Sequence, residues 1–125
     1  MQLLGPGRRR VRWLPRLGLL AMILSAATSG VAAQEKVIAV TAERFKFTPG
    51  VIQLKVGEPV VLELTSLDRK HGFQVPDLKI DETIEPGKVT RVRIVPDKAA
   101  TYDFHCSIVC GSGHEDMAGQ IVVSP

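Results

Sequence analysis

Two cysteines, a histidine and a methionine lie within twelve consecutive residues near the C-terminus. They are Cys106, Cys110, His114 and Met117, in the spacing C-x3-C-x3-H-x2-M. Thiolate and thioether sulfur combined with imidazole nitrogen favour copper over hard cations such as magnesium or calcium. The packing of a hydrophobic core does not require these four side chains at these intervals. The spacing therefore predicts a copper site in this segment.

A fifth candidate ligand, His71, comes from a separate part of the chain. It follows the polar stretch 67–70 and begins a short apolar alternation, so we expect it at the start of a strand. Two copper arrangements are open. The donors of a mononuclear site with a weak axial methionine would be His71, Cys110, His114 and Met117. A binuclear site adds Cys106, and this second cysteine favours it, because a mononuclear site gives that thiolate no role.

A disulfide and a structural zinc site are the alternatives for the two cysteines. Disulfides are common in exported proteins, but cysteines four residues apart in one loop are poorly placed for disulfide geometry. A zinc site built from the two cysteines, His71 and His114 would leave Met117 without a role. His105 is excluded from the site, because strand alternation turns its side chain away from that of its neighbour Cys106.

Residues 1–33 have the pattern of an export signal. Five arginines lie within residues 8–16, an apolar run follows over 17–27, and small residues end the segment at Ala33. We predict cleavage after Ala33 and a periplasmic or secreted protein. The alternative is an uncleaved membrane anchor, because residues 17–34 carry no charge over 18 positions.

The remaining residues, 34–125, are enough for one domain. They hold 11 basic and 13 acidic side chains, a net charge of −2, so the basic balance of the whole chain belongs to the signal segment. No basic patch with interleaved aromatic residues remains, and we predict no nucleic-acid binding. The acidic residues between 77 and 85 are interpreted as solvated surface charges, with a docking face for a redox partner as the alternative. These are Asp77, Asp81, Glu82 and Glu85.

Short alternations of apolar and polar residues, separated by Gly, Pro and Asp, predict an all-β domain built as an antiparallel β-sandwich. No helical periodicity is present after residue 34. We expect strands at residues 36–42, 45–47, 51–56, 59–66, 71–75, 78–84, 88–95, 101–105 and 119–123, of which 78–84 is the weakest. In a sandwich the loops gather at the two ends, so residues 106–117 should form a loop at one pole.

The chain resembles the cupredoxins, and most closely the CuA domain of cytochrome c oxidase subunit II and nitrous oxide reductase. The motifs that carry the resemblance are Phe45-Lys-Phe-Thr-Pro49, Val56-Gly-Glu58, His71-Gly-Phe73, Glu85-Pro-Gly87, Tyr102 four residues before Cys106, the cysteine loop, and Gly119-Gln-Ile-Val-Val123. The resemblance implies a Greek-key sandwich and a binuclear copper centre bridged by Cys106 and Cys110. It further implies His71 and Met117 on one copper, and His114 with the backbone carbonyl of Ile108 on the other. Ile108 stands where the oxidases usually carry glutamate.

The predicted function is one-electron transfer by an exported copper protein, for a respiratory oxidase or reductase. A c-type cytochrome or the oxidase itself would be the redox partner. No pairing of a nucleophile with a base is evident, so we interpret the chain as an electron carrier and not as an enzyme. The alternatives are an exported copper chaperone or storage protein, and an oxidase subunit II anchored by a single N-terminal helix.

Overall fold

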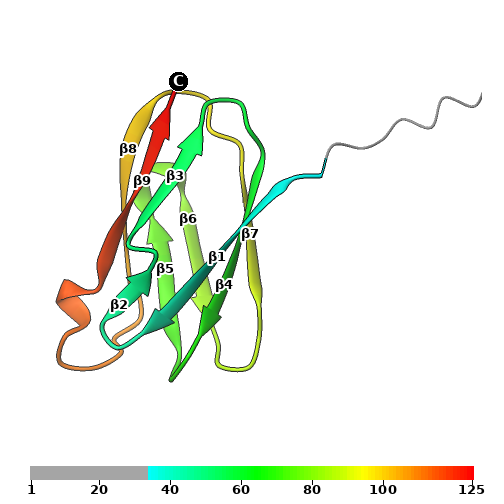
Figure 1. Cartoon of the computed structure of the whole chain (residues 1–125). Helices are drawn as coiled ribbons and strands as arrows, with labels where there is room; N and C mark the ends of the chain where they lie inside the picture. The colour runs from blue at the N-terminus through cyan, green and yellow to red at the C-terminus, as the bar shows by residue number, and fades with distance from the viewer. Residues whose placement is uncertain (1–33) are drawn as a thin grey trace, which may run out of the picture. The chain divides into compact units, whose positions relative to one another are not determined.

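Two β-sheets face each other in residues 34–125, the part of the chain that the computed structural model describes (Figure 1). The predicted export signal, residues 1–33, lies outside the described residues. Within 34–125, none of the helices has the length and apolar character needed to cross a membrane.

The first sheet has four strands in the order β2-β1-β4-β7. Their bounds are Lys46–Thr48 for β2, Lys36–Glu43 for β1, Val60–Ser66 for β4 and Thr90–Ile94 for β7. The second sheet has five strands in the order β3-β9-β8-β5-β6. Their bounds are Val51–Lys55 for β3, Ala118–Ser124 for β9, Ala100–His105 for β8, His71–Val75 for β5 and Ile80–Ile84 for β6.

The predicted all-β sandwich is confirmed, and each expected strand is present. The sheets are mixed, however, because β1 runs parallel to β4 and β3 runs parallel to β9. An alternating pattern reports which face of a strand is buried and not which strand lies beside it, so these two parallel pairings could not be predicted. Two short 3-10 helices, η1 (Pro76–Leu78) and η2 (His114–Asp116), were also not expected.

The core beneath one end of the sandwich is aromatic. Phe47 of β2, Phe73 of β5 and Phe104 of β8 pack with ring centroids 4.9 to 5.9 Å apart. Phe73 follows His71 by two residues and Phe104 precedes Cys106 by two, so each ring lies on the same strand face as a candidate ligand. The packed core therefore fixes the direction in which both candidate ligands leave the sheet.

Candidate metal centre

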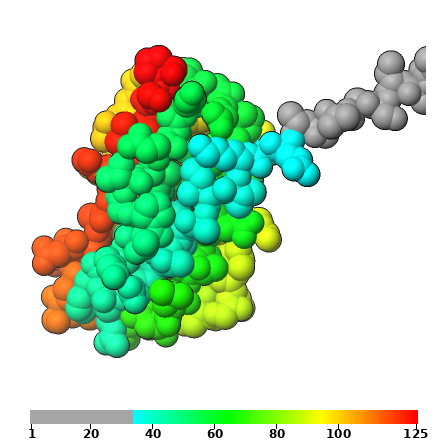
Figure 2. All heavy atoms as spheres, in the orientation of Figure 1, coloured from blue at the N-terminus to red at the C-terminus, as the bar shows by residue number. Residues whose placement is uncertain are grey.

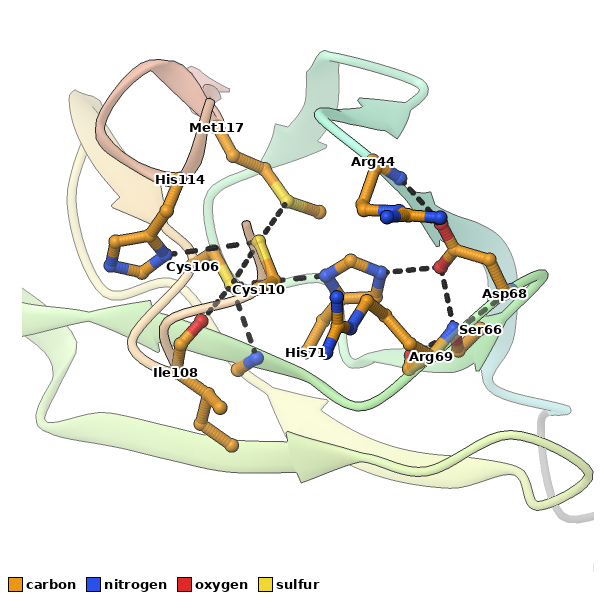
Figure 3. A network of polar contacts seen from close by, with 11 residues as sticks. Arg44, Ser66, Asp68, Arg69, His71, Cys106, Ile108, Cys110, His114 and Met117 are labelled. Atoms are coloured by element: carbon orange, nitrogen blue, oxygen red, sulfur yellow. Dashed lines mark hydrogen bonds and ion pairs between the residues drawn. The ribbon is translucent and has the colours of Figure 1, made fainter. Parts of the chain in front are cut away.

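The candidate ligands gather at one end of the second sheet, where β5 begins and the β8–β9 loop lies. His71 is the first residue of β5, and Cys106 directly follows β8. The loop closes through a hydrogen bond from the Cys106 backbone N–H to the Met117 carbonyl, at 2.9 Å. His114 lies in η2, within this loop. Two segments 35 residues apart in sequence thus meet at one pole (Figure 3).

Each of the five predicted side-chain donors lies within 3.9 Å of at least one cysteine sulfur. The sulfurs are 3.8 Å apart. His71 Nδ1 lies 3.9 Å from the Cys106 sulfur, and His114 Nδ1 lies 3.8 Å from the Cys110 sulfur. Met117 Sδ is 3.7 Å from the Cys110 sulfur. The Ile108 carbonyl oxygen lies 3.1 Å from the Cys106 sulfur, so the predicted main-chain donor also faces the cluster.

The two cysteines are free thiols. Their sulfur separation of 3.8 Å far exceeds the bond length of a disulfide, about 2.05 Å. A metal ion bonded to a sulfur at about 2.3 Å and to an imidazole at about 2.0 Å leaves those two donors roughly 3 to 4 Å apart. The spacing of sulfur and nitrogen here therefore fits donors that share a metal, and it does not fit a disulfide.

Four of the five side-chain donors are buried, and the fifth, His114, is partly exposed. His71, Cys110 and Met117 have no exposed surface and Cys106 is 2% exposed, whereas His114 is half-buried. Burial raises the pKa of the Cys110 thiol, and its contact with Cys106 raises it further. Both cysteines must lose protons to bind a metal as thiolates, so metal uptake at this site releases protons.

His71 is held by Asp68, a residue that sequence analysis assigned only to a polar loop. Asp68 Oδ1 lies 2.7 Å from His71 Nε2. The backbone N–H groups of Arg44 and Arg69 also donate to this carboxylate, at 2.8 and 2.7 Å. A carboxylate on one ring nitrogen places the proton there and leaves the other free to bind a metal. Here the free nitrogen is Nδ1, which faces Cys106. The D-x-x-H spacing was the available signal.

The same contacts set the charge of Asp68. Burial alone would raise its pKa, but the hydrogen bond with His71 and the two backbone N–H donors outweigh burial. The pKa of Asp68 is therefore held far below its ordinary value, and the carboxylate stays ionised beside the imidazole.

The β8–β9 loop is pressed between two neighbours. On one side Gly72 gives it room: a Cβ there would lie only 2.7 Å from the backbone nitrogen of Ser107. On the other side the ring of Phe45 packs against Gly111 and Gly113. In Figure 2 the orange atoms of this loop lie beside the blue-green atoms of the β1–β2 turn, which carries Phe45. Gly111 also has a φ of 145°, which only glycine adopts readily.

Several residues next to the candidate donors in the sequence are half-buried or exposed. His105 is half-buried between the buried side chains of Phe104 and Cys106, as strand alternation predicts. Glu115 and Asp116 are exposed in η2. Val109, between the two cysteines, is 78% exposed and points an apolar side chain toward solvent at this pole.

A family model described as a cupredoxin-like domain matches residues 16–123 of the chain. Cytochrome c oxidase subunit 2 of Thermus thermophilus is 37% identical over 84 residues, which cover 67% of this chain and 62% of the relative. Nitrous-oxide reductase of Cupriavidus necator is 28% identical over 90 residues, covering 69% of this chain and 14% of that protein. The chain thus spans less than two thirds of either relative.

Among solved structures, a chain from the cryo-EM structure of a heme-copper terminal oxidase dimer superposes with a TM-score of 0.66 at 28% identity. The superposition covers 75% of this chain and 68% of that one. The fold and the sequence of the chain are therefore both similar to proteins from copper-containing oxidases and to the cupredoxin-like family.

Proposed function

Because the chain belongs to the cupredoxin-like domain family, we propose that its histidine, cysteine and methionine cluster holds copper and exchanges single electrons through it. One observation carries the proposal. Two buried free thiols lie 3.8 Å apart, and each has an imidazole Nδ1 within 3.9 Å. Sulfur and imidazole donors together select copper over hard metals.

We propose a binuclear centre of the CuA type. Its ligands would be His71, Cys106, the Ile108 carbonyl, Cys110, His114 and Met117. A mononuclear site needs one cysteine, yet Cys106 lies buried in the middle of the cluster, with His71, Cys110 and the Ile108 carbonyl all within 3.9 Å of its sulfur. Two thiolates at this separation support a bridge between two ions, with one imidazole on each.

Bound copper would supply the change between two oxidation states. The chain would keep the donors in one arrangement through that change. Cys106 and His71 are attached to adjacent strands of one sheet, and Asp68 accepts a hydrogen bond from Nε2 of His71, on the side of the ring away from Cys106. Donors that do not move between oxidation states reduce the reorganisation that each electron transfer requires. His114 is the most exposed side-chain donor, so a redox partner would approach on its side of the pole.

The relatives suggest where such electrons go. We propose that the chain works with a respiratory oxidase or reductase and receives or passes electrons through a partner such as a c-type cytochrome. We further propose that residues 1–33 direct export and are removed after Ala33, so that residues 34–125 act in the periplasm or outside the cell. N-terminal sequencing of the exported protein tests this last point: a start at Gln34 supports cleavage, and a start at Met1 contradicts it.

Copper stoichiometry and spectroscopy test the centre itself. The reduced, metal-free chain is loaded with copper without oxygen and then oxidised by one electron. We expect two coppers per chain, intense visible absorption from thiolate-to-copper charge transfer, and an electron paramagnetic resonance signal spread over two copper nuclei. A colourless complex that loses its copper to a weak chelator at each redox cycle would contradict electron transfer and support copper delivery instead.

Cys106→Ser separates the binuclear from the mononuclear centre. The variant keeps the four donors of a mononuclear site but loses one bridge, so we expect it to bind one copper and to change its spectrum. Ser112→Ala, at an exposed position of the same loop, is the matched control and should keep two coppers. The binuclear proposal fails if Cys106→Ser retains two coppers and the wild-type spectrum.

A further inference from the structure

A side-chain hydrogen bond joins the metal loop to the edge strand β6. Ser107, the residue after Cys106, donates from its hydroxyl to Asp81 Oδ1 at 2.8 Å. The other carboxylate oxygen of Asp81 accepts from Gln74 Nε2 at 3.4 Å. Asp81 is one of the acidic residues that the sequence alone assigns to solvated surface. None of these three residues belongs to the proposed ligand set.

The loop reaches β6 by crossing over β5. The strand order β8-β5-β6 places β5 between the end of β8, where the loop starts, and the strand that carries Asp81. Gly72 of β5 lies beneath the crossing, since a Cβ on it would lie 2.7 Å from the Ser107 nitrogen and 3.0 Å from the Ile108 nitrogen. The segment 106–108 therefore lies against β5 and is fastened on its far side by Asp81.

The hydrogen bond between Ser107 and Asp81 affects the Ile108 carbonyl, the least constrained of the proposed donors. A backbone carbonyl has no side chain of its own to orient it, so the conformation of the neighbouring residues decides where its oxygen points. The Ile108 carbonyl belongs to the peptide group between residues 108 and 109, and the apolar Ile108 side chain cannot hydrogen-bond. The bond from the Ser107 hydroxyl to Asp81 is therefore the side-chain contact that restrains the backbone directly before Ile108. The backbone of residues 106–108 connects the Cys106 sulfur with the Ile108 oxygen, which lie 3.1 Å apart.

We propose that Asp81 and Ser107 form a clasp that positions Cys106 and the Ile108 carbonyl for the metal. Both are positioning residues, since they act through the backbone of the loop and touch no donor atom of the proposed centre. The inference rests on the proposed copper function. The clasp requires a hydrogen-bond acceptor at position 81 and a donor at position 107, whereas a simple surface charge at Asp81 would require neither.

The first test uses the full, metal-free, reduced chain and needs no copper. Local opening of the loop exposes the buried Cys106 thiol, so the rate of its reaction with a small alkylating reagent measures how firmly the loop is held. We expect Ser107→Ala and Asp81→Ala each to raise this rate about fivefold through loss of one charge-assisted hydrogen bond. The double variant should react no faster than either single variant, because both remove the same contact.

Two further variants separate the hydrogen bond from the charge. Asp81→Asn removes the charge but keeps an acceptor oxygen, and should retain the wild-type rate within about twofold. Glu82→Ala removes a charge from the next residue of β6, which is also exposed, and should leave the rate unchanged. The clasp is contradicted if Asp81→Asn and Glu82→Ala raise the rate as much as Ser107→Ala does, or if none of the variants changes it.

The second test uses the copper-loaded chain. Loss of a contact that orients a ligand from outside the metal site typically weakens binding 10- to 100-fold, and we expect Ser107→Ala to release copper to a chelator about tenfold faster. Both cysteines remain, so the variant should still bind two coppers but show an altered electron paramagnetic resonance spectrum. Glu82→Ala should match the wild type in both measurements.

The outcomes distinguish the clasp from the proposed function. If the wild type binds copper and Ser107→Ala has the same release rate and spectrum, the clasp inference is wrong and the copper function stands. If the wild type binds no copper, the copper function fails, and with it the positioning role toward a metal. The thiol reaction rates then decide whether the clasp holds the loop at all.

Discussion

The contact between His71 and Asp68 decides which nitrogen of a fully buried imidazole faces the cluster. The carboxylate accepts from Nε2, and Nδ1 is turned toward Cys106. Asp68 itself accepts from the backbone of Arg44 in the β1–β2 turn and of Arg69 in its own loop. The orientation of one proposed ligand therefore depends on a residue that lies outside the proposed metal site and links it to the turn of the other sheet.

Asp68→Asn should destabilise the metal-free chain by about 1–3 kcal/mol at pH 7, because an amide offers one neutral acceptor oxygen where the carboxylate accepts from three N–H groups. The pKa of Asp68 is lower in the folded chain than in the unfolded chain. Its stabilisation is therefore present above the unfolded pKa, about 3.9, and is lost as the pH falls toward the folded pKa. Urea unfolding should show the difference between wild type and variant shrinking below about pH 4.

Asp97→Asn is the control, since Asp97 is exposed in the β7–β8 connection. We expect its free energy of unfolding to remain within about 0.5 kcal/mol of the wild type both at pH 7 and at pH 2.5. A wild-type advantage over Asp68→Asn that is equally large at pH 2.5 and pH 7 would show that the carboxylate charge is not its cause.

Sequence reasoning identified the candidate donors that the structure brings together, but not the residues that orient them. Cys106, Cys110, His114 and Met117 stand out because their chemistry is rare and their spacing has no packing explanation. Asp68 and Asp81 are ordinary polar residues near strand ends. Apart from the D-x-x-H spacing of Asp68 and His71, the sequence does not separate a solvated carboxylate from one that accepts a hydrogen bond beside the proposed site. That distinction depends on which loops meet in space.

At the scale of elements, the β8–β9 loop keeps its shape because neighbours confine it on both sides. Gly113 has a φ of −98°, which other residues also adopt, so its glycine is not required by backbone conformation. A Cβ at this position would instead lie 2.5 Å from Cγ of the Phe45 ring. The ring of the β1–β2 turn therefore sets how large the loop residues can be.

Gly113→Ala should destabilise the chain by about 1–3 kcal/mol, the usual range for overpacking a well-packed site. Urea unfolding measures it. Gly50→Ala is the matched control, since its new Cβ would come no closer than 3.7 Å to any atom outside the adjoining residues. In the background of Phe45→Ala, Gly113→Ala should lower the free energy of unfolding much less, because the obstructing ring is gone. Equal costs with and without Phe45 would mean that the ring does not confine the loop.

The strand pattern predicted the elements well and their arrangement less completely. β3 occupies residues 51–55, where the alternation predicted a strand at 51–56, since a strand with one buried face has a clear period of two. The parallel pairs β1–β4 and β3–β9 carry no local signal, because pairing direction is set by how distant segments meet. Helix η2 is a single short turn, too brief to leave a periodic pattern, although it positions His114.

At the scale of the whole molecule, the sandwich brings distant segments of the sequence together at one pole, where His114 alone among the side-chain donors is partly exposed. The phenylalanine rings of β2, β5 and β8 fill the core below the cluster and join both sheets. The donors above them belong to β5 and to the β8–β9 loop. A metal bound to all of them would join segments that the metal-free chain holds only by packing and hydrogen bonds, so binding should be coupled to global stability.

Copper loading should therefore raise the unfolding temperature of the chain. A ligand that binds only the folded state stabilises it by about 2.7 kcal/mol at a free concentration one hundred times its Kd. For a domain of this size each kcal/mol shifts Tm by about 4–8 °C, so we expect a rise of about 10–20 °C. Thermal unfolding without oxygen, with Cu(I) and then with excess chelator, measures the rise and its reversal.

Two comparisons show whether this rise comes from the cluster. Mg²⁺, a hard cation, should leave Tm unchanged because sulfur donors bind it poorly. Cys110→Ser removes the thiolate that lies next to Cys106, His114 and Met117, and should abolish most of the copper-induced rise. A rise as large in Cys110→Ser as in the wild type would place the copper elsewhere on the chain. The convergence of donors at this pole would then be a feature of packing alone, and the coupling between the centre and the fold would not exist.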